Sequence, residues 1–511
     1  MKMIRTIFRP SKIAALSGLL IFSACSDFLD KPLQGQLTQQ VFPTTPGDAL
    51  SATNAVYNTL RTSSYHFGLF PLTDIMSDDA RKGSNPTDQA STIGPYDNFA
   101  HVSTETTMAD WWNTLYHGIR SANVVIEKVP AIDMDATLKA RYVAEASFLR
   151  ALFYFDLARG WGGVPLVTAT VNPPTLTRAT MGEIYNLIIS DLQVAIAGLP
   201  EKSGYTGADT GRITKSAANG LLAKVYLFLP QTSLLNYVPQ PDFVNAEKYA
   251  LAVINSGLYS LEPDFANANG VNGEYGVESI FEIGALPFEG VENGGDQYGN
   301  VQGVRGTPNR GWGFNRPSMD LMANYESGDP REDKTIIFLG EVIDGVTIIG
   351  DPSTPDMTKD ASGNVIEIQC YNQKVWTPGS NVPTQFEHHR RMLRYADILL
   401  IAAEASNENG KTGQALQYLN QVRARARGGN ISILPDITET DQNLLRNIIL
   451  KERRIELALE GNRFWDLVRT NNAEAVLGPL GFVKGKHELL AIPQTEIDLS
   501  HGSLTQNTGW N

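Results

Sequence analysis

The sequence predicts a mainly α protein, in which helical hairpins form a scaffold and a long insertion of loops and short strands interrupts it. Apolar residues recur at three- and four-residue spacing, as at Trp111, Leu115 and Ile119, which is the period of an amphipathic helix. Short connections join several helical segments, so neighbouring helices should lie antiparallel. Between about residues 261 and 389 the helical period stops, and Gly, Asn, Pro and Asp become frequent.

Each expected helix is supported by its period and by the residues at its ends. The first follows Pro46, and proline suits the first turn of a helix. The third contains the run Phe148–Phe155, which is apolar nearly all round, so this helix should be buried on several sides before it ends at Gly160. In chain order, the expected helices cover residues 48–61, 108–128, 136–159, 181–198, 215–229, 243–255, 390–409, 412–427 and 442–469.

Two helix pairs have the pattern of hairpins. Residues 393–405 and 415–423 carry stripes of alanine, leucine and tyrosine and are joined through Asn409-Gly410, which is typical of tetratricopeptide-type hairpins. Residues 215–229 and 243–255 form a looser second pair. Because the pairs are not contiguous in the chain, we expect a tetratricopeptide-like scaffold and not a regular solenoid.

The insertion contains four short β-like runs, and long irregular insertions on a rigid scaffold usually carry function. The runs cover residues 279–283, 335–339, 346–349 and 365–370. We therefore expect the scaffold to comprise about residues 40–260 and 390–511, and the ligand loops to lie in about 261–389.

The N-terminus has the layout of an export signal. Four basic residues precede an apolar stretch, Ile13–Phe22, which is too short to span a bilayer. Ser23 and Ala24 then precede Cys25, as in a bacterial lipoprotein signal, although Phe22 stands where leucine is usual. We expect residues 1–24 to be removed and Cys25 to carry the lipid, with 25–511 forming a single domain. The alternative is an ordinary secretory signal with a chance cysteine.

Composition excludes some classes of partner. The formal charge is −13, and removing the four basic residues of the signal from the 42 in the chain leaves 38 against 55 acidic ones, or −17. Nucleic-acid binding and flat docking on anionic lipid both depend on clustered Lys and Arg, so neither is expected. Cys25 and Cys370 are the only cysteines, so a lipidated Cys25 leaves Cys370 without a disulfide partner in the chain.

Acidic and basic residues are concentrated near the C-terminus, but they do not resemble a catalytic site. Glu452, Glu456 and Glu460 recur every fourth residue among arginines, whereas a glycosidase needs two carboxylates facing each other across a cleft. We expect these groups to be ion-paired within the scaffold, and we interpret Glu145 and Arg150 as another structural pair.

Metal and nucleotide motifs are also lacking. His388 and His389 are adjacent and no third ligand has metal-like spacing, so no metal site is expected. The segment Ala405–Thr412 imitates a phosphate-binding loop, but it lacks the first glycine and follows a helix instead of a strand. The sequence therefore predicts neither a cofactor nor an enzyme.

Two clusters of aromatic and polar residues in expected loops suit a sugar ligand. Aromatic rings pack on the apolar face of a pyranose, and Asp, Asn and Arg satisfy its hydroxyl groups. Trp312 lies between Gly311 and Gly313, so its indole should stand clear of the loop, and Arg310 and Arg316 bracket it. The alternative is that these aromatic residues merely hold the loops to the scaffold. The candidate ligand-binding residues are Asp79, Arg81, Tyr96, Asn98, Tyr298, Arg310, Trp312 and Phe314.

An ordered set of segments along the whole chain resembles the SusD/RagB family of outer-membrane nutrient-binding lipoproteins. Each segment is modest alone, but their order is specific, and Thr508 is a small departure where the family usually has proline. The matching segments are Cys25–Asp30, Trp112–Asn123, Ala144–Phe155, Trp161–Leu166, Arg394–Leu400, Glu452–Leu467, Ile492–Pro493 and Gln506–Trp510.

The resemblance implies a tetratricopeptide-like fold and a lipid anchor on the external face of the outer membrane. It also implies a partner, a SusC-type TonB-dependent transporter, over which the lipoprotein would act as a lid that delivers a nutrient, usually a glycan fragment. No catalysis is implied. Two alternatives remain: a helical protein–protein adaptor, which would bind no small ligand, and a surface glycan-degrading enzyme, which would turn over oligosaccharide.

Overall fold

Helices make up about half of the chain described by the computed structural model, which covers residues 42–172, 176–230, 236–285, 297–378 and 387–510. The long helices are α1 (Pro46–Thr59), α3 (Thr106–Lys128), α4 (Ala136–Trp161), α5 (Met181–Gly198), α6 (Lys215–Leu227), α7 (Phe243–Ile254), α11 (Tyr395–Glu408), α12 (Thr412–Ala426) and α13 (Gln442–Glu456). The short ones are α2 (Ser63–Phe70), α8 (Phe265–Asn269), α9 (Gln297–Gln302), α10 (Met319–Asn324), α14 (Arg463–Arg469), α15 (Ala473–Leu477) and α16 (Gln494–Leu499). The predicted mainly α class is confirmed.

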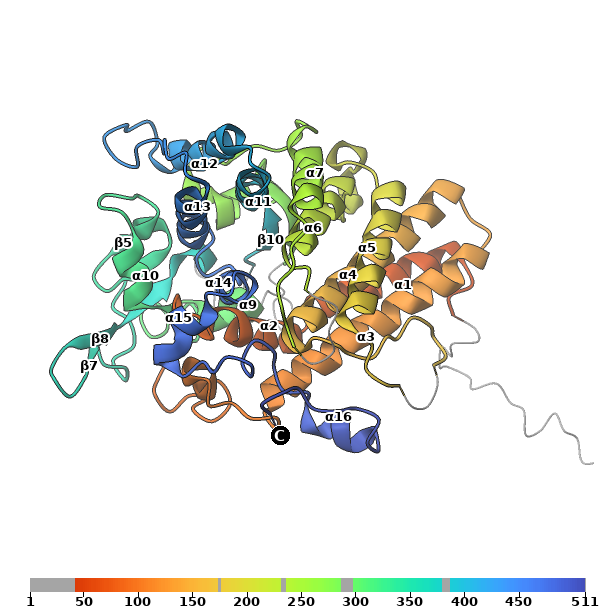
Figure 1. Ribbon diagram of the computed structural model, residues 1–511, viewed down its shortest axis with the longest axis horizontal. Coiled ribbons are helices and arrows are strands. Elements are labelled where there is room, and N and C mark those ends of the chain that lie inside the picture. The colour runs from red at the N-terminus through yellow and green to blue at the C-terminus, as the bar shows by residue number, and fades with distance from the viewer. Residues whose placement is uncertain (1–41, 173–175, 231–235, 286–296, 379–386, 511) are drawn as a thin grey trace, which may run out of the picture. The chain divides into compact units, whose positions relative to one another are not determined.

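The long helices form a continuous row in space (Figure 1). Helix α3 packs on α4, α4 on α5, α5 on α6, α6 on α7, α7 on α11, and α11 on both α12 and α13. The contact between α7 and α11 joins two hairpins that the insertion separates in the chain. The scaffold is therefore contiguous in space although its hairpins are not contiguous in sequence.

Local sequence explains where these helices begin and how closely they pack. Thr180 caps α5, because its hydroxyl accepts the backbone N–H of Glu183 at 3.2 Å while the Glu183 carboxylate accepts the backbone N–H of Thr180 at 2.8 Å. Gly118 lets α3 approach α4, since a Cβ there would lie 2.4 Å from the Phe153 ring. Residues Phe148–Phe155 are all buried, as their apolar run predicts.

Ten short strands within the described residues form five antiparallel pairs. The pairs are β1 (Ala80–Gly83) with β3 (Phe314–Pro317), β2 (Ser279–Ile283) with β10 (Arg390–Arg394), β4 (Ile336–Phe338) with β9 (Cys370–Asn372), β5 (Val342–Ile343) with β6 (Val346–Thr347), and β7 (Met357–Lys359) with β8 (Val365–Ile368). Strand β2 lies in the first part of the insertion, β10 follows its end directly, and the two pair with each other, for example Ile283 with Arg390. The insertion thus leaves and rejoins the scaffold at one place.

Two predicted helices are wrong in part. The segment expected as helix 390–409 begins as strand β10, because Arg390–Arg394 pairs with β2, and becomes helical only at Tyr395. The segment expected as helix 442–469 breaks after Glu456, where Leu459 and Gly461 adopt φ values of 61° and 76°. A left-handed residue cannot continue a helix, so α13 and α14 are separate.

Buried ion pairs join this break to the rest of the molecule. Glu456 contacts Arg394 at 2.7 Å, Arg331 at 3.1 Å and Arg425, and Glu452 contacts Arg331 at 2.6 Å. Burial would raise the pKa of Glu456, but Arg425, Arg394 and Arg331 hold it well below its usual range. The prediction that these carboxylates are ion-paired in the scaffold is confirmed.

The second predicted ion pair is wrong. Glu145 contacts Arg212 at 2.8 Å and Arg141 at 3.2 Å, whereas Arg150 contacts Asp191 at 2.7 Å. Both groups are buried and structural. Arg141 is a neighbour of Glu145 on α4, but Arg212 and Asp191 come from other segments, which spacing along α4 does not reveal.

Of the two cysteines, the structure describes Cys370 but not Cys25. Cys25 and the expected signal lie outside the described residues. Cys370 is buried and makes no disulfide with any described residue, and burial raises the pKa of its thiol to about 12. Within the described ranges, no helix is long and apolar enough to cross a membrane.

Candidate ligand-binding site

Trp312 is the most exposed of the seven tryptophans, with 36% of its surface accessible to solvent. It lies directly before strand β3, and its backbone N–H donates to the carbonyl of Asn300 in helix α9 at 3.1 Å. A tryptophan held by its backbone with its indole at the surface presents a large flat apolar area to solvent. Such an area suits a sugar ring.

The two glycines beside Trp312 serve close backbone packing. A Cβ at Gly311 would lie 2.4 Å from the carbonyl oxygen of Asn300, and Gly313 has a φ of 75°. The carbonyl of Gly313 also accepts the backbone N–H of Ser84 at 2.6 Å. The sequence predicted that these glycines leave room around the indole. The structure shows that they also let the loop pack closely against α9 and β1.

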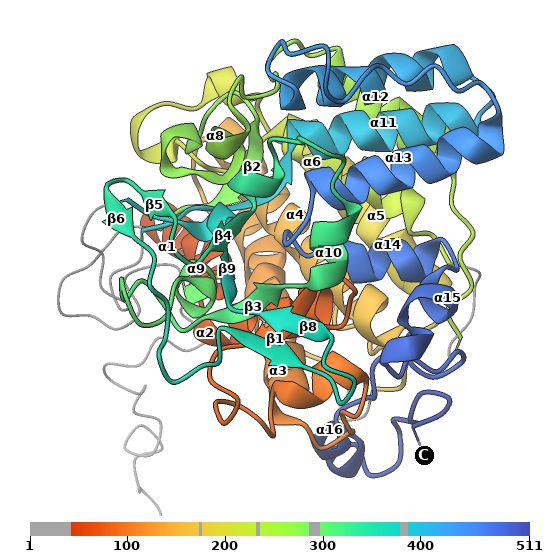
Figure 2. The ribbon, with the colours of Figure 1, turned by 90° about the vertical axis from the view of Figure 1, so that its left-hand side faces the viewer.

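Strand pairing brings the two predicted clusters together. Arg81 lies opposite Arg316, and Gly83 lies opposite Phe314, so β1 runs beside the strand that follows Trp312 (Figure 2). Arg81 is half-buried, and its guanidinium donates to the carbonyl of Ala80 at 2.8 Å. Phe314 is buried, with the Lys82 ammonium 5.7 Å from its ring centre.

The short 3₁₀ helix η3 (Gly94–Asn98) packs on β1 through Asp97. Both oxygens of the Asp97 carboxylate accept the backbone N–H of Lys82, at 2.8 and 3.1 Å, and burial raises the pKa of Asp97 to about 7. Asn98 is exposed, whereas Tyr96 is fully buried with its ring stacked on His101 at 4.8 Å. Of this pair, Asn98 is the one accessible to a ligand in this conformation.

Asp79 and Tyr298 are held in the interior. Asp79 has no exposed surface, and its carboxylate accepts from Arg454 Nε at 2.7 Å. Tyr298 is 5% exposed; its hydroxyl donates to the carbonyl of Leu459 at 3.1 Å, and the Arg390 guanidinium lies 4.1 Å from its ring centre. In this conformation Asp79 contacts α13, and Tyr298 joins α9 to the break between α13 and α14, so neither side chain faces solvent.

The two arginines that bracket Trp312 differ in their surroundings. Arg316 Nη1 contacts Glu367 in β8 at 2.7 Å, so it ties strand β3 to the β7–β8 hairpin. Arg310 lies with its guanidinium 5.3 Å from the ring centre of Trp376, and burial lowers its pKa. Its Nη1 has no hydrogen-bond partner among the described residues, which leaves a donor beside the Trp312 loop.

The candidate residues thus divide into an accessible set and a supporting set. Trp312, Asn98 and the partly exposed Arg81 offer an aromatic face and polar groups on neighbouring segments. The supporting set is buried and fixes those segments: Asp79, Tyr96, Tyr298, Arg310 and Phe314. Contact between the accessible set and a ligand stays a prediction.

Sequence reasoning did not select the residues that line a cavity of about 570 Å³ in another part of the molecule. They come from α1, from the loop before α6 and from β2, and most are single aromatic or polar residues without a motif. Tyr275 carries the clearest structural feature, a left-handed backbone, which one sequence does not reveal.

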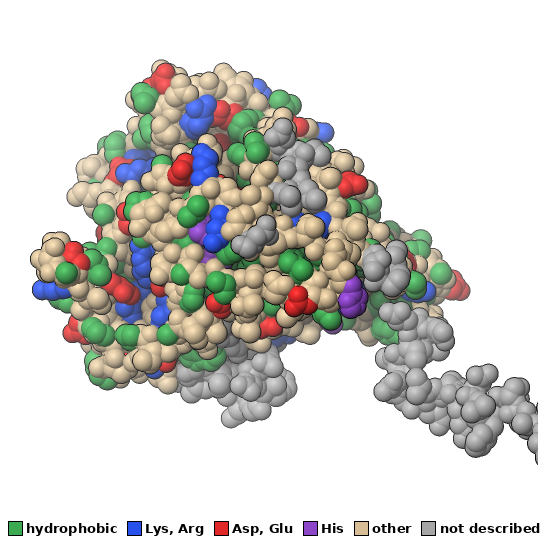
Figure 3. All heavy atoms as spheres, turned by 60° about the horizontal axis from the view of Figure 1, so that its bottom comes forward, with side chains coloured by type: hydrophobic (Ala, Val, Ile, Leu, Met, Phe, Trp, Pro, Cys, Tyr) green, Lys and Arg blue, Asp and Glu red, His purple; other side chains and the backbone are tan. Residues whose placement is uncertain are grey.

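The surface in Figure 3 has no large region of one charge. Acidic and basic side chains are interspersed on the face shown, with apolar groups between them. No group of three or more potential metal ligands occurs among the residues that the structure describes.

Comparison with known proteins assigns the chain to a family. The SusD family matches residues 277–485, and a second family, described as starch-binding associating with outer membrane, matches residues 53–227. SusD-like protein P2 of Formosa agariphila is 30% identical over 98% of this chain and 99% of its own length. The chain belongs to the SusD/RagB family.

Solved structures agree with this assignment. A laminarin-binding SusD-like protein is 26% identical and superposes with a TM-score of 0.74, covering 91% of this chain and 100% of its own. Surface glycan-binding protein A from Bacteroides thetaiotaomicron, solved in complex with laminarihexaose, is 25% identical with the same TM-score and the same coverage. The tetratricopeptide-like scaffold predicted from the helical hairpins is thus shared with SusD-like proteins.

Proposed function

We propose that this protein is a cell-surface lipoprotein that binds an oligosaccharide or glycan fragment and performs no catalysis. The likeness to surface glycan-binding protein A, solved with laminarihexaose, carries this proposal, since it extends over 91% of the chain. The exposed indole of Trp312 on a loop fixed by its backbone supports it, because an aromatic face is the usual platform for a sugar.

We further propose that the lipid on Cys25 anchors the protein to the outer membrane, and that the protein delivers its ligand as a lid to a SusC-type TonB-dependent transporter. Family membership supports both steps. The transporter should co-purify with the protein from detergent-solubilised outer membranes. Its absence from such preparations, with the lipoprotein itself recovered, would favour a protein that acts without this partner.

The positions of two carboxylates support the proposal that the protein performs no catalysis. Glu452 and Glu456 are buried and ion-paired to arginines, with no more than 4% of either side chain exposed, so neither faces a cleft as a glycosidase acid must. Incubation of the purified protein with laminarihexaose should leave the oligosaccharide intact by chromatography. Release of shorter products by the homogeneous protein would instead support the enzyme.

Calorimetric titration of the mature protein with laminarihexaose tests binding directly. We expect saturable binding, because the relative that was solved with this oligosaccharide shares the whole scaffold. A panel of other oligosaccharides, which differ from laminarihexaose in linkage, tests whether the protein binds other glycans as well. If no oligosaccharide binds, the helical adaptor becomes the better hypothesis.

A further inference from the structure

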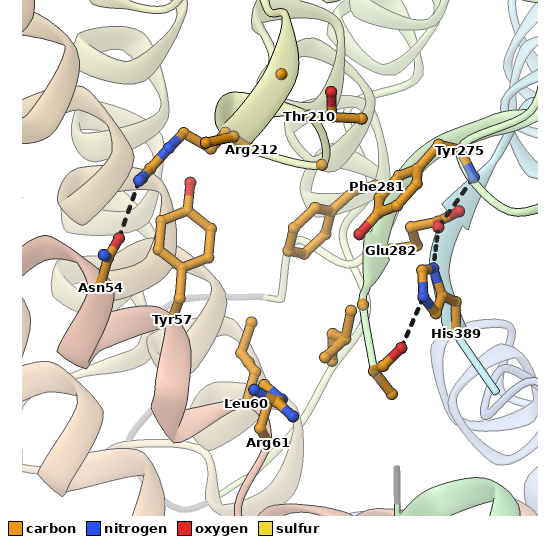
Figure 4. A pocket seen from close by; sticks show the side chains of 16 residues that line it. Asn54, Tyr57, Leu60, Arg61, Thr210, Arg212, Tyr275, Phe281, Glu282 and His389 are labelled. Carbon is orange, nitrogen blue, oxygen red and sulfur yellow. Dashed lines mark hydrogen bonds and ion pairs between the residues drawn. The ribbon is translucent and has the colours of Figure 1, made fainter. Parts of the chain in front are cut away.

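The cavity of about 570 Å³ lies at the junction of α1, the loop before α6 and strand β2 (Figure 4). This volume is within the range of about 300–1,000 Å³ typical of small-molecule sites. An adjoining cavity of about 160 Å³ shares Tyr275, Phe281, Glu282 and the segment 210–212 with it. The lining contains no residue of the Trp312 loop or of β1, so this is a separate site.

Three aromatic side chains from separate segments face this cavity. Tyr57 comes from α1, Phe281 from β2, and Tyr275 from the turn before β2. Figure 4 shows the Tyr57 and Tyr275 rings on opposite sides of the open space, with Phe281 between them. Rings placed in this way offer apolar surface to more than one face of a ligand.

Polar groups lie at the edges of these rings. Arg212 donates to Glu145 at 2.8 Å and to Asn54 Oδ1 at 3.0 Å, which fixes both the guanidinium and the amide at the wall of the cavity. Since its oxygen is used by Arg212, Asn54 can offer its amide N–H groups. The Tyr57 hydroxyl is fixed by the backbone N–H of Ile213 at 3.2 Å.

Tyr275 is held in an unusual conformation. Its φ is 51°, which is strained for a bulky side chain and persists only when the surroundings impose it. Its backbone N–H donates to Glu282 Oε1 at 3.0 Å, and its ring packs edge-on against His389 at 4.9 Å. His389 is itself fixed by Glu282, with Nδ1 and Oε1 2.7 Å apart.

Two glycines leave room for the Tyr275 ring. A Cβ at Gly211 would lie 2.6 Å from Tyr275 Cε1, and a Cβ at Gly284 would lie 2.3 Å from the Tyr275 hydroxyl. The strained backbone and both glycines therefore place one aromatic side chain at the boundary between the two cavities. Structural stability alone gives no reason for this, because a relaxed residue would fill the same turn at lower cost.

We propose that this cavity is a second binding site, for a short saccharide, in which Tyr57, Phe281 and Tyr275 pack against the sugar rings. A sugar fits because it combines apolar C–H faces with many hydroxyl groups, and the cavity combines ring faces with the fixed groups of Asn54 and Arg212. The Trp312 site and this site are independent, so either proposal can fail without the other.

The test uses the mature chain and saturation-transfer NMR with glucose, galactose, mannose, xylose, N-acetylglucosamine and laminaribiose as probes, followed by titration of the best one. Tyr275→Gly removes the ring and suits the left-handed backbone, so the melting temperature should hold or rise while saccharide affinity falls roughly tenfold. Gly284→Ala keeps the ring but displaces it, and should weaken binding as well. Trp312→Ala should leave this binding event unchanged.

Three results would overturn the proposal. One is that none of the six saccharides shows saturation transfer, with or without indole, added as an aromatic probe, occupying the cavity. Another is that binding is the same in Tyr275→Gly and Gly284→Ala as in the unaltered protein. The third is that binding is lost in Trp312→Ala alone.

Discussion

Arg394 Nη1 and Glu456 Oε1 lie 2.7 Å apart, and no more than 1% of either side chain is exposed. Arg394 is the last residue of strand β10, which closes the insertion, and Glu456 is the last residue of α13. The ion pair therefore fastens the end of the insertion to the C-terminal part of the scaffold. Burying such a pair is favourable only when each charge has further partners, and both residues have them.

Removing one member of this cluster should destabilise the fold. Glu456→Gln removes the buried carboxylate that Arg394, Arg331 and Arg425 share. Each of these buried charges then has one counter-charge fewer, so we expect the free energy of unfolding to fall by about 3–5 kcal/mol. Chemical denaturation monitored by circular dichroism measures this. Lys484→Ala, which breaks the exposed pair with Glu474, is the matched control and should change stability little. A Glu456→Gln protein as stable as the control would show that the cluster contributes nothing.

Trp312→Ala should weaken binding of laminarihexaose by about 1–3 kcal/mol, the scale of losing one stacked aromatic contact. The fold should be unchanged, because the indole is exposed and the loop is held by backbone hydrogen bonds. Ile431→Ala removes another exposed apolar side chain and serves as the control. Equal affinity in both variants would remove Trp312 from the site.

Two buried histidines should make the protein less stable in mild acid. Burial lowers the pKa of His101 to about 3 and that of His487 to about 4, whereas in the unfolded chain both protonate near pH 6.5. The unfolded state therefore binds more protons as the pH falls from about 6.5 towards 3, and stability declines across that window. His101→Phe, which cannot protonate and keeps a ring against Tyr96, should show a shallower decline of melting temperature with pH.

The control for this experiment is His117→Gln, which alters an exposed histidine on α3. Its melting temperature should follow the pH dependence of the unaltered protein. If His101→Phe follows it too, the acid sensitivity comes from other groups.

Cys25→Ala should release the protein from the membrane fraction, since the attached lipid supplies the anchoring energy. The measurement is fractionation in a strain that lacks the transporter, so that no partner retains the protein. Cys370→Ala, which alters the buried cysteine, should leave the membrane fraction unchanged. Retention of the Cys25→Ala protein would argue against the lipoprotein.

Helical segments with a strong period were predictable to within a few residues. Helix α5 begins at Met181 and ends at Gly198 as expected, because its capping residues are local in sequence. The two errors at 390–394 and 457–462 have a different origin. Strand β10 forms only because β2 lies beside it, and the break after α13 depends on left-handed residues, so both are set by contacts between distant segments.

For the candidate site, too, the sequence predicted the surroundings of some residues and not of others. The exposure of Trp312 agrees with its place in an expected loop, whereas the burial of Asp79 and Tyr298 depends on Arg454 and Leu459 from the C-terminal part of the chain. In sequence, a polar loop residue that contacts a ligand looks the same as one that holds the loop in place. Only the identity of its partner separates the two roles.

The pairing of β2 with β10 affects how the segment between these strands can vary among relatives of this protein. Because Ile283 and Arg390 lie opposite each other, the two ends of the segment between them are held side by side by one strand pair. The length and sequence of this segment can change where it does not contact the scaffold, since α7 contacts α11 directly, whereas Arg331 must keep its ion pairs with α13. A laboratory exchange of residues 284–389 between relatives therefore offers a route to new ligand preferences on a constant frame.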